Sequence, residues 1–266
     1  SYGNIGFVYD EQKNYDKAME FYDKALKIQE QVLDSLSPDL ATLYNNIGFV
    51  YHSQDNYDKA MEFYDKALKI QEQVLNPLSP DLAISYNNIG MVYHSQKNYN
   101  KAMEFYDKAL KIDEQVLNPL SPSLANLYNN IGMVYHSQKN YNKAIEFYDK
   151  ALKIKEQVLN PLSPALVALY NNIGSVYREQ GYYDKAMEFY NKALKIREQV
   201  LNPLSLDLAV SYGNIGLVCL QANKLDKALE YFKKALPGYI KAFGEENENT
   251  QLIKQAIEYC KQALEE

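Results

Sequence analysis

The sequence has no tryptophan, only two cysteines (Cys219 and Cys260) and only three histidines among its 266 residues. Two cysteines cannot supply the disulfide framework of a small secreted domain, so a reducing, cytoplasmic setting is favoured. No run of about 18 apolar residues is present, and Ser1 opens no signal-like segment, so no membrane association is expected. The net charge is −6 without any basic block, which disfavours nucleic-acid binding. The composition predicts a soluble cytoplasmic protein.

The sequence does contain one motif many times. YNNIG occurs at Tyr44–Gly48, Tyr86–Gly90, Tyr128–Gly132 and Tyr170–Gly174, and YGNIG occurs at Tyr2–Gly6 and Tyr212–Gly216. Each step is 42 residues, and a fixed period of this length indicates a repeat array. Residues Tyr86–Leu127 and Tyr128–Leu169 differ at five positions only: Met103/Ile145, Asp113/Lys155, Ser123/Ala165, Ala125/Val167 and Asn126/Ala168. This near-identity points to duplication with little later drift, so sameness alone is weak evidence of function.

Each repeat predicts two helices joined by a tight turn. In residues 37–78, Ser37-Pro38-Asp39 is a helix start, since a hydroxyl caps free N–H groups, proline suits the first turn and an acid suits the positive end of the helix dipole. Apolar residues then recur at steps of three and four, at Leu40, Leu43, Tyr44, Ile47, Val50 and Tyr51. A turn at Asp55-Asn56 leads to a second helix that starts at Tyr57 and is ended by Asn76-Pro77.

The chain is therefore predicted to be all-α, a single solenoid domain over residues 1–266. We expect a truncated first repeat (1–36), five full repeats (37–78, 79–120, 121–162, 163–204 and 205–246) and a C-terminal capping helix (247–266). Gly48, Ala60 and Ala67 predict a close contact between the two helices of a repeat. Pro237-Gly238 is expected to kink or shorten the last second helix. The incomplete first helix suggests a segment of a longer array.

The small and aromatic residues match a known repeat. Tyr44, Gly48, Tyr51, Ala60, Tyr64 and Ala67 have the spacing of the tetratricopeptide repeat, with tyrosine where that family often has tryptophan. The longer period, together with L-A-x-x-Y-N-N-I-G and L-x-I-x-E-Q-V-L, closely resembles the repeats of kinesin light chains. The resemblance implies a right-handed superhelix whose concave wall is lined by the first helix of each repeat. Relatives that grip acidic C-termini place lysine and arginine on that wall, where this chain has asparagine and apolar residues, so that clamp is not expected.

The first helix carries a second face, opposite its core face, and stacking of the repeats would align this face into columns of like residues. The first column is Asn46, Asn88, Asn130, Asn172 and Asn214, preceded by Asn4, and the second is Asn45, Asn87, Asn129 and Asn171. Beside them lie Phe49, Met91 and Met133, and then His52, His94 and His136.

These columns suggest two uses. Each amide offers a donor and an acceptor, so a column of amides can pair with the backbone of an extended peptide whatever its sequence. Methionine and phenylalanine would accept apolar side chains adaptably. Asparagine ladders in kinesin-light-chain-like repeats bind extended peptides, so the resemblance implies the same use. The alternative is that the asparagines bond to neighbouring helices and only tie the stack together.

No catalytic or metal site is expected, and no cofactor. The histidines lie one repeat apart, too far for an easy shared zinc shell, and no nucleophile–base pair is recognisable. We therefore expect a non-catalytic scaffold for an extended peptide or protein segment. Other hypotheses are an architectural or self-assembling array, and a sensor or recruitment arm of a larger signalling protein. The chain is expected to be monomeric in dilute solution, with weak head-to-tail stacking when concentrated.

Overall fold

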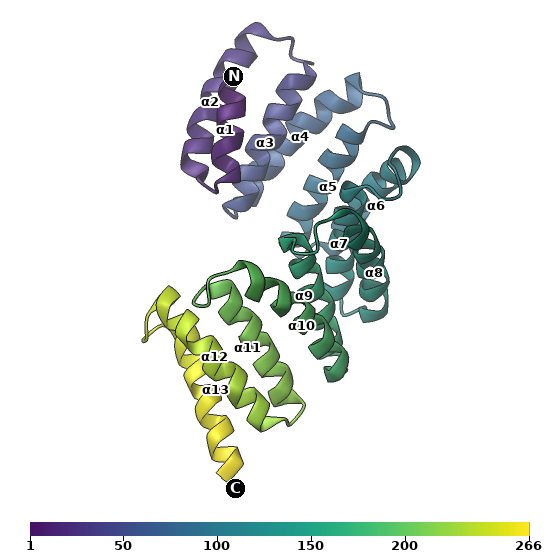
Figure 1. The fold of residues 1–266 in the computed structure, drawn as a ribbon. Coiled ribbons are helices and arrows are strands. Elements are labelled where there is room, and N and C mark those ends of the chain that lie inside the picture. Colours follow the sequence, from purple (N-terminus) through teal and green to yellow (C-terminus); the bar gives the residue numbers. More distant parts are fainter. Residues whose placement is uncertain (266) are drawn as a thin grey trace. The chain divides into compact units, whose positions relative to one another are not determined.

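A computed structural model describes residues 1–265, and every regular element in them is an α-helix (Figure 1). The helices are α1 (Tyr2–Glu11), α2 (Tyr15–Val32), α3 (Pro38–Ser53), α4 (Tyr57–Val74), α5 (Pro80–Ser95), α6 (Tyr99–Val116), α7 (Pro122–Ser137), α8 (Tyr141–Val158), α9 (Pro164–Glu179), α10 (Tyr183–Val200), α11 (Leu206–Gln221), α12 (Leu225–Phe243) and α13 (Glu248–Glu265). None of these helices is both long and apolar enough to cross a membrane. The predicted all-α array of helix pairs is confirmed.

The helices gather into two compact units, Ser1–Val134 and Tyr135–Glu266, whose boundary falls within α7. In the first unit, α1 packs on α2, α3 on α4 and α5 on α6. In the second unit, α9 packs on α10, α11 on α12, and α13 on α12. Each second helix also contacts the next first helix, as α2 does with α3 and α10 with α11. Every hairpin therefore shares its core with its neighbours in the same unit.

The helix ends follow from local sequence. The helices α3, α5, α7 and α9 all begin at the proline of the Ser-Pro start, and Ser79 Oγ accepts a hydrogen bond from Asp81 N (3.3 Å). Asp55 has φ +58°, the left-handed conformation that lets the chain reverse before α4. The next residue caps the second helix, since Asn56 Oδ1 accepts from Lys59 N (3.3 Å). These boundaries agree with the predicted turn and the start at Tyr57.

The glycine of the motif leaves room for an aromatic ring. A Cβ at Gly48 would lie 2.7 Å from Cδ1 and Cε1 of Tyr64, which comes from α4 and is 1% exposed. The same relation joins Gly6 to Tyr22, Gly90 to Tyr106, Gly174 to Tyr190 and Gly216 to Phe232. The predicted close contact between the paired helices is confirmed, and the group that fills it is this buried ring.

The tyrosine of the motif ties each hairpin to the preceding one. Tyr44 O–H donates to Glu30 Oε1 on α2 (3.0 Å). The same bond joins Tyr86 to Glu72, Tyr128 to Glu114, Tyr170 to Glu156 and Tyr212 to Glu198, at 2.8 to 3.0 Å. Burial and the carboxylate raise the pKa of Tyr44 to about 12, so its hydroxyl keeps its proton at neutral pH.

The last hairpin corrects the expectation that Pro237-Gly238 shortens its second helix. Pro237 lies inside α12, which has 19 residues and is thus not shortened relative to the 18 residues of α10. Gly238 replaces the isoleucine of other repeats, and a Cβ there would lie 2.5 Å from Ala209 Cβ on α11. We infer that tight packing on α11 holds the helix together across the proline, a tertiary effect that overrides local propensity.

The predicted C-terminal capping helix is confirmed as α13, and its Ile257 is buried. Cys219 and Cys260 are both free and belong to the core cluster beneath it. Ile253 and Ala256 are half-buried and pack against this cluster too. The exposed apolar residues of α13 are Leu252, Tyr259 and Leu264.

Helix α1 presents an uncovered apolar side. Ile5 and Val8 are 41% and 53% exposed, whereas Ile47 and Val50 at the same repeat positions are fully buried. We predict weak head-to-tail association of this chain through α1. Sedimentation velocity should show monomers at low concentration and reversible larger species at high concentration, and Val8→Lys should remove the larger species. Identical sedimentation of both proteins at every concentration would contradict this prediction.

Candidate functional site

The second face of the first helices is accessible. On α3, Thr42 and Phe49 are exposed, and Asn45, Asn46 and His52 are half-buried. In the first unit, α3 lies beside both α1 and α5, so equivalent residues of successive repeats approach one another. The faces that carry the predicted columns therefore adjoin along this part of the chain.

The first asparagine of the motif bonds to its neighbours. Asn45 Nδ2 donates to Ser85 Oγ on α5 (2.8 Å), and Ser85 Oγ donates to Gln71 Oε1 at the end of α4 (2.5 Å). Asn87 Oδ1 accepts from Asn130 Nδ2 on α7 (2.9 Å). Amides engaged in this way have less capacity for a ligand, which supports the structural alternative for the column of Asn45 and Asn87.

The second asparagine is more open. Asn46, Asn88 and Asn214 are half-buried, and their side chains make no hydrogen bond within residues 1–265. Asn130 is engaged by Asn87, and Asn172 also has a partner. The sequence offers no reason to distinguish these asparagines, whereas the structure leaves some of the second asparagines open and engages others. Asn46 and Asn88, on adjacent helices, have unused donors and acceptors.

The methionines and histidines border the asparagines. Asn87 Nδ2 and Asn129 Nδ2 approach the sulfurs of Met91 and Met133 at 3.7 and 3.6 Å. These are weak contacts, since a thioether is a poor acceptor. Both methionines are half-buried, so they remain in reach of an apolar side chain on this face.

Within the described residues, His52 and His136 contact different partners. His52 Nε2 lies 3.2 Å from Ser95 Oγ, and His136 Nε2 lies 3.1 Å from Glu179 Oε2. Burial lowers the pKa of His52 and His94, so both rings are neutral at pH 7. No group of three or more His, Cys, Asp or Glu residues within 1–265 is placed to hold a metal ion.

Two hollows open on this face in the first unit. One, of about 570 Å³, lies between α1 and α3 and is lined by Asn4, Phe7, Gln29, Thr42 and Asn46 among others. The other, of about 200 Å³, lies between α5, α6 and α7 and is lined by Ile84, Asn87, Asp113, Leu117, Ser123 and Asn126 among others. Each hollow combines the asparagine face with a residue near the end of a second helix.

Sequence reasoning missed those second-helix residues. Gln71, Asp113 and Lys155, at equivalent positions, are 4%, 6% and 8% exposed. The side chains of Asp113 and Lys155 have no hydrogen bond or ion pair in the described part of the chain. Burial raises the pKa of Asp113 to about 6 and lowers the pKa of Lys155. Polar residues late in an amphipathic helix are usually solvated, and the available signal was that Asp113/Lys155 is one of five differences between near-identical repeats.

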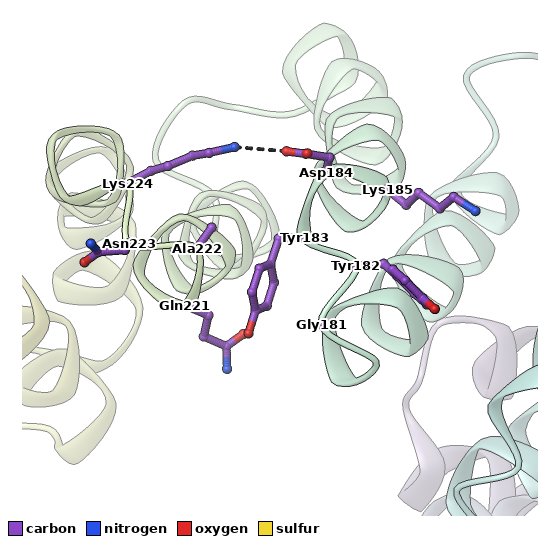
Figure 2. A pocket seen from close by; sticks show the side chains of 9 residues that line it. All are labelled: Gly181, Tyr182, Tyr183, Asp184, Lys185, Gln221, Ala222, Asn223 and Lys224. Carbon is purple, nitrogen blue, oxygen red and sulfur yellow. Dashed lines mark hydrogen bonds and ion pairs between the residues drawn. The ribbon is translucent and has the colours of Figure 1, made fainter.

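A third hollow lies at the turns of the second unit. Figure 2 shows its lining, in which Lys224, just before α12, reaches Asp184 at the start of α10, with Nζ 2.9 Å from Oδ1. Asp184 is almost fully exposed, so this ion pair contributes little. The hollow holds none of the predicted site residues.

The sequence profile of the tetratricopeptide repeat matches residues 1–73, 39–115, 81–157, 123–199 and 165–241. The chain belongs to the tetratricopeptide-repeat family. Such repeats are generally protein–protein interaction scaffolds and typically non-catalytic. The expected likeness to kinesin-light-chain-like repeats is found in the fold of the solved structures that this chain resembles.

Three solved structures show the likeness. BtubC (BKLC) from P. vanneervenii has a TM-score of 0.71 at 24% identity, over 89% of this chain and 93% of that chain. A putative kinesin light chain of Podosopora anserina with nearly identical TPR-like repeats has a TM-score of 0.67 at 16% identity, over 78% and 98%. A chain of the APC/C hetero-tetramer Cut9–Hcn1 has a TM-score of 0.71 at 17% identity, over 97% and 42%. These identities establish a shared fold only. No curated protein sequence gave a significant match.

Proposed function

We propose that this tetratricopeptide-repeat chain is a non-catalytic scaffold that binds an extended peptide segment of a partner protein along the asparagine face. The observation that carries the proposal is the pair of open amides, Asn46 and Asn88, on adjacent first helices. Asparagine is several tenths of a kcal/mol worse than alanine in a helix interior, and the side chains of these two offset none of this cost by a hydrogen bond within residues 1–265. Binding of a ligand backbone would account for their presence.

The neighbouring side chains suit such a ligand. Phe49 is 40% exposed, and Met91 is half-buried, so both can contact apolar side chains of the segment. His52 and His94 are neutral and add no charge to this part of the face. A fold of the same kind occurs in the hetero-tetramer Cut9–Hcn1, which agrees with a role in assembly with another protein.

A purely architectural array is the second candidate, because the bonds of Asn45 to Ser85 and of Asn130 to Asn87 join neighbouring first helices. The two uses are compatible, since they involve different amides. They can be separated by changing the open amides and the bonded amides in different variants.

The test compares two double variants in binding and in stability. Asn46→Ala with Asn88→Ala should leave the melting temperature equal or higher and weaken peptide binding about thirtyfold, since each of the two lost hydrogen bonds is worth about 1 kcal/mol. Asn45→Ala with Asn87→Ala should instead lower the free energy of unfolding by about 1 kcal/mol or more, because inter-repeat bonds are lost. The probe is the strongest binder from a random dodecapeptide display library, measured by fluorescence anisotropy.

Two results would contradict the proposal. If the chain captures no dodecapeptide, only the architectural role remains. A melting temperature lowered by many degrees in the Asn46/Asn88 variant, with peptide affinity unchanged, would show that these amides serve the fold.

A further inference from the structure

Two positions of the repeat hold a different residue in every hairpin from 37 to 246. One lies near the end of the second helix: Gln71, Asp113, Lys155, Arg197 and Tyr239. The other lies in the first helix: Thr42, Ile84, Asn126, Ala168 and Val210. At every other position at least two of these hairpins agree. Random drift would be expected first at exposed positions, yet exposed residues such as Lys66 and Gln73 are identical in the four hairpins of residues 37–204.

The fold brings these two positions together. Asp113 and Asn126 line the 200 Å³ hollow, and Gln29 and Thr42 line the hollow between α1 and α3. In the second unit, Arg197 Nη1 donates to Ser211 Oγ (2.7 Å), and Ser211 directly follows Val210 in the sequence. The variable pair is therefore formed by the end of one second helix and the following first helix, next to the repeated asparagines.

The asparagines are thus repeated from hairpin to hairpin, whereas the variable pair beside them changes. Amides can pair with the backbone of any extended segment, whereas Gln, Asp, Lys and Arg at one position differ in the side chains that they attract. A hollow of about 200 Å³ is smaller than the pockets that take whole small-molecule ligands, and its size suits a single side chain.

Building on the proposed function, we infer that the variable pair selects side chains of the bound segment, and that the hollow at Asp113 takes a lysine or arginine side chain. The Asp113 carboxylate is 6% exposed and has no cation beside it in the described structure. Ile84, which is 50% exposed, and Leu117 give the hollow aliphatic walls. A lysine or arginine would lay its apolar stem along these walls and bring its charge to the carboxylate.

The electrostatics agree. Desolvation raises the pKa of Asp113 to about 6, and no other titratable side chain lines the hollow. A cation that entered would stabilise the charged carboxylate and bring this pKa back down.

The test uses substitutions that the chain itself carries at this position. Asp113→Gln copies Gln71, and Asp113→Lys copies Lys155, which is 8% exposed in its own repeat, so both should fold. Asp107→Gln and Asp107→Lys are the matched controls, because Asp107 is an exposed residue of the same helix, α6. All five proteins are panned against the same random dodecapeptide library. The strongest binder of the parent is then made with each of its basic residues replaced in turn by norleucine.

We expect one basic residue of the peptide to be coupled to Asp113. Its replacement by norleucine should weaken binding to the parent and to both Asp107 variants about tenfold or more, and should change little in binding to Asp113→Gln. Asp113→Lys should select peptides with an acidic residue at that place. Equal norleucine effects in the parent and Asp113→Gln, or unchanged selection by Asp113→Lys, would overturn the inference while leaving peptide binding intact. Failure of the parent to capture any peptide would instead overturn the proposed function, and this inference with it.

Discussion

Replacing Gly90 by leucine is expected to destabilise the chain severely. A Cβ at Gly90 would lie 2.6 Å from Cε1 and 2.7 Å from Cδ1 of Tyr106. Tyr106 is 1% exposed, so its ring has no free space to move into. Overpacking of a close-packed core typically costs about 1–3 kcal/mol. Because even one added carbon would clash here, we expect the cost of the branched leucine side chain to reach or exceed the top of this range. Urea denaturation should show the loss, and it should extend to neighbouring hairpins because repeats stabilise one another.

Alanine at the same position gives a sharper form of this test. Gly90→Ala alone should be destabilising, because the clash with the ring exceeds the gain of about 1 kcal/mol in helix propensity. In a Tyr106→Ala background, itself destabilised by about 3–5 kcal/mol, Gly90→Ala should become stabilising.

A second glycine serves as the control. A Cβ at Gly213 in α11 would meet nothing closer than Tyr239 Oη at 3.7 Å, so Gly213→Ala should stabilise the chain by up to about 1 kcal/mol. If Gly90→Ala and Gly213→Ala behave alike, the ring at Gly90 is not the constraint.

Asp113→Gln is expected to stabilise the unliganded chain at pH 7.5 by up to about 3 kcal/mol, with the gain disappearing towards pH 4. The pKa of Asp113 is raised to about 6 in the folded chain, against an ordinary value of 3.8. Between these values the folded state binds more protons than the unfolded state, so stability falls as the pH rises through this window. The penalty is absent below about pH 4 and complete above about pH 6, and glutamine never carries it.

Urea denaturation of the two proteins between pH 4 and pH 8 measures this difference. Asp107→Gln, which changes an exposed carboxyl group of the same helix, should show little difference at any pH. A gain from Asp113→Gln that is the same at pH 4 and pH 8 would contradict the assignment, because it would not follow the titration of the carboxyl group.

Most of the fold could be predicted because its signals are local. The Ser-Pro starts, the turn at Asp55-Asn56 and the steps of three and four residues each act within one or two helical turns. The function could be predicted only to the level of its class. The open Asn46 and the bonded Asn45 are adjacent in the sequence and have the same chemistry, so no local rule tells them apart.

The sequence by itself determined the repeat, its helical hairpins, its core face and the membership of each residue in a column. The tertiary structure alone decided which group fills each contact. In the folded chain, Tyr64 packs on Gly48, and Asn45 is hydrogen-bonded to Ser85, which lies 40 residues further along the sequence. The tertiary structure keeps α12 helical through Pro237, and it brings Asp113 and Asn126 to one hollow. The physical reason is that hydrophobic periodicity fixes which side of a helix is buried, whereas the crossing and register of packed helices depend on side chains that meet only after the chain has folded.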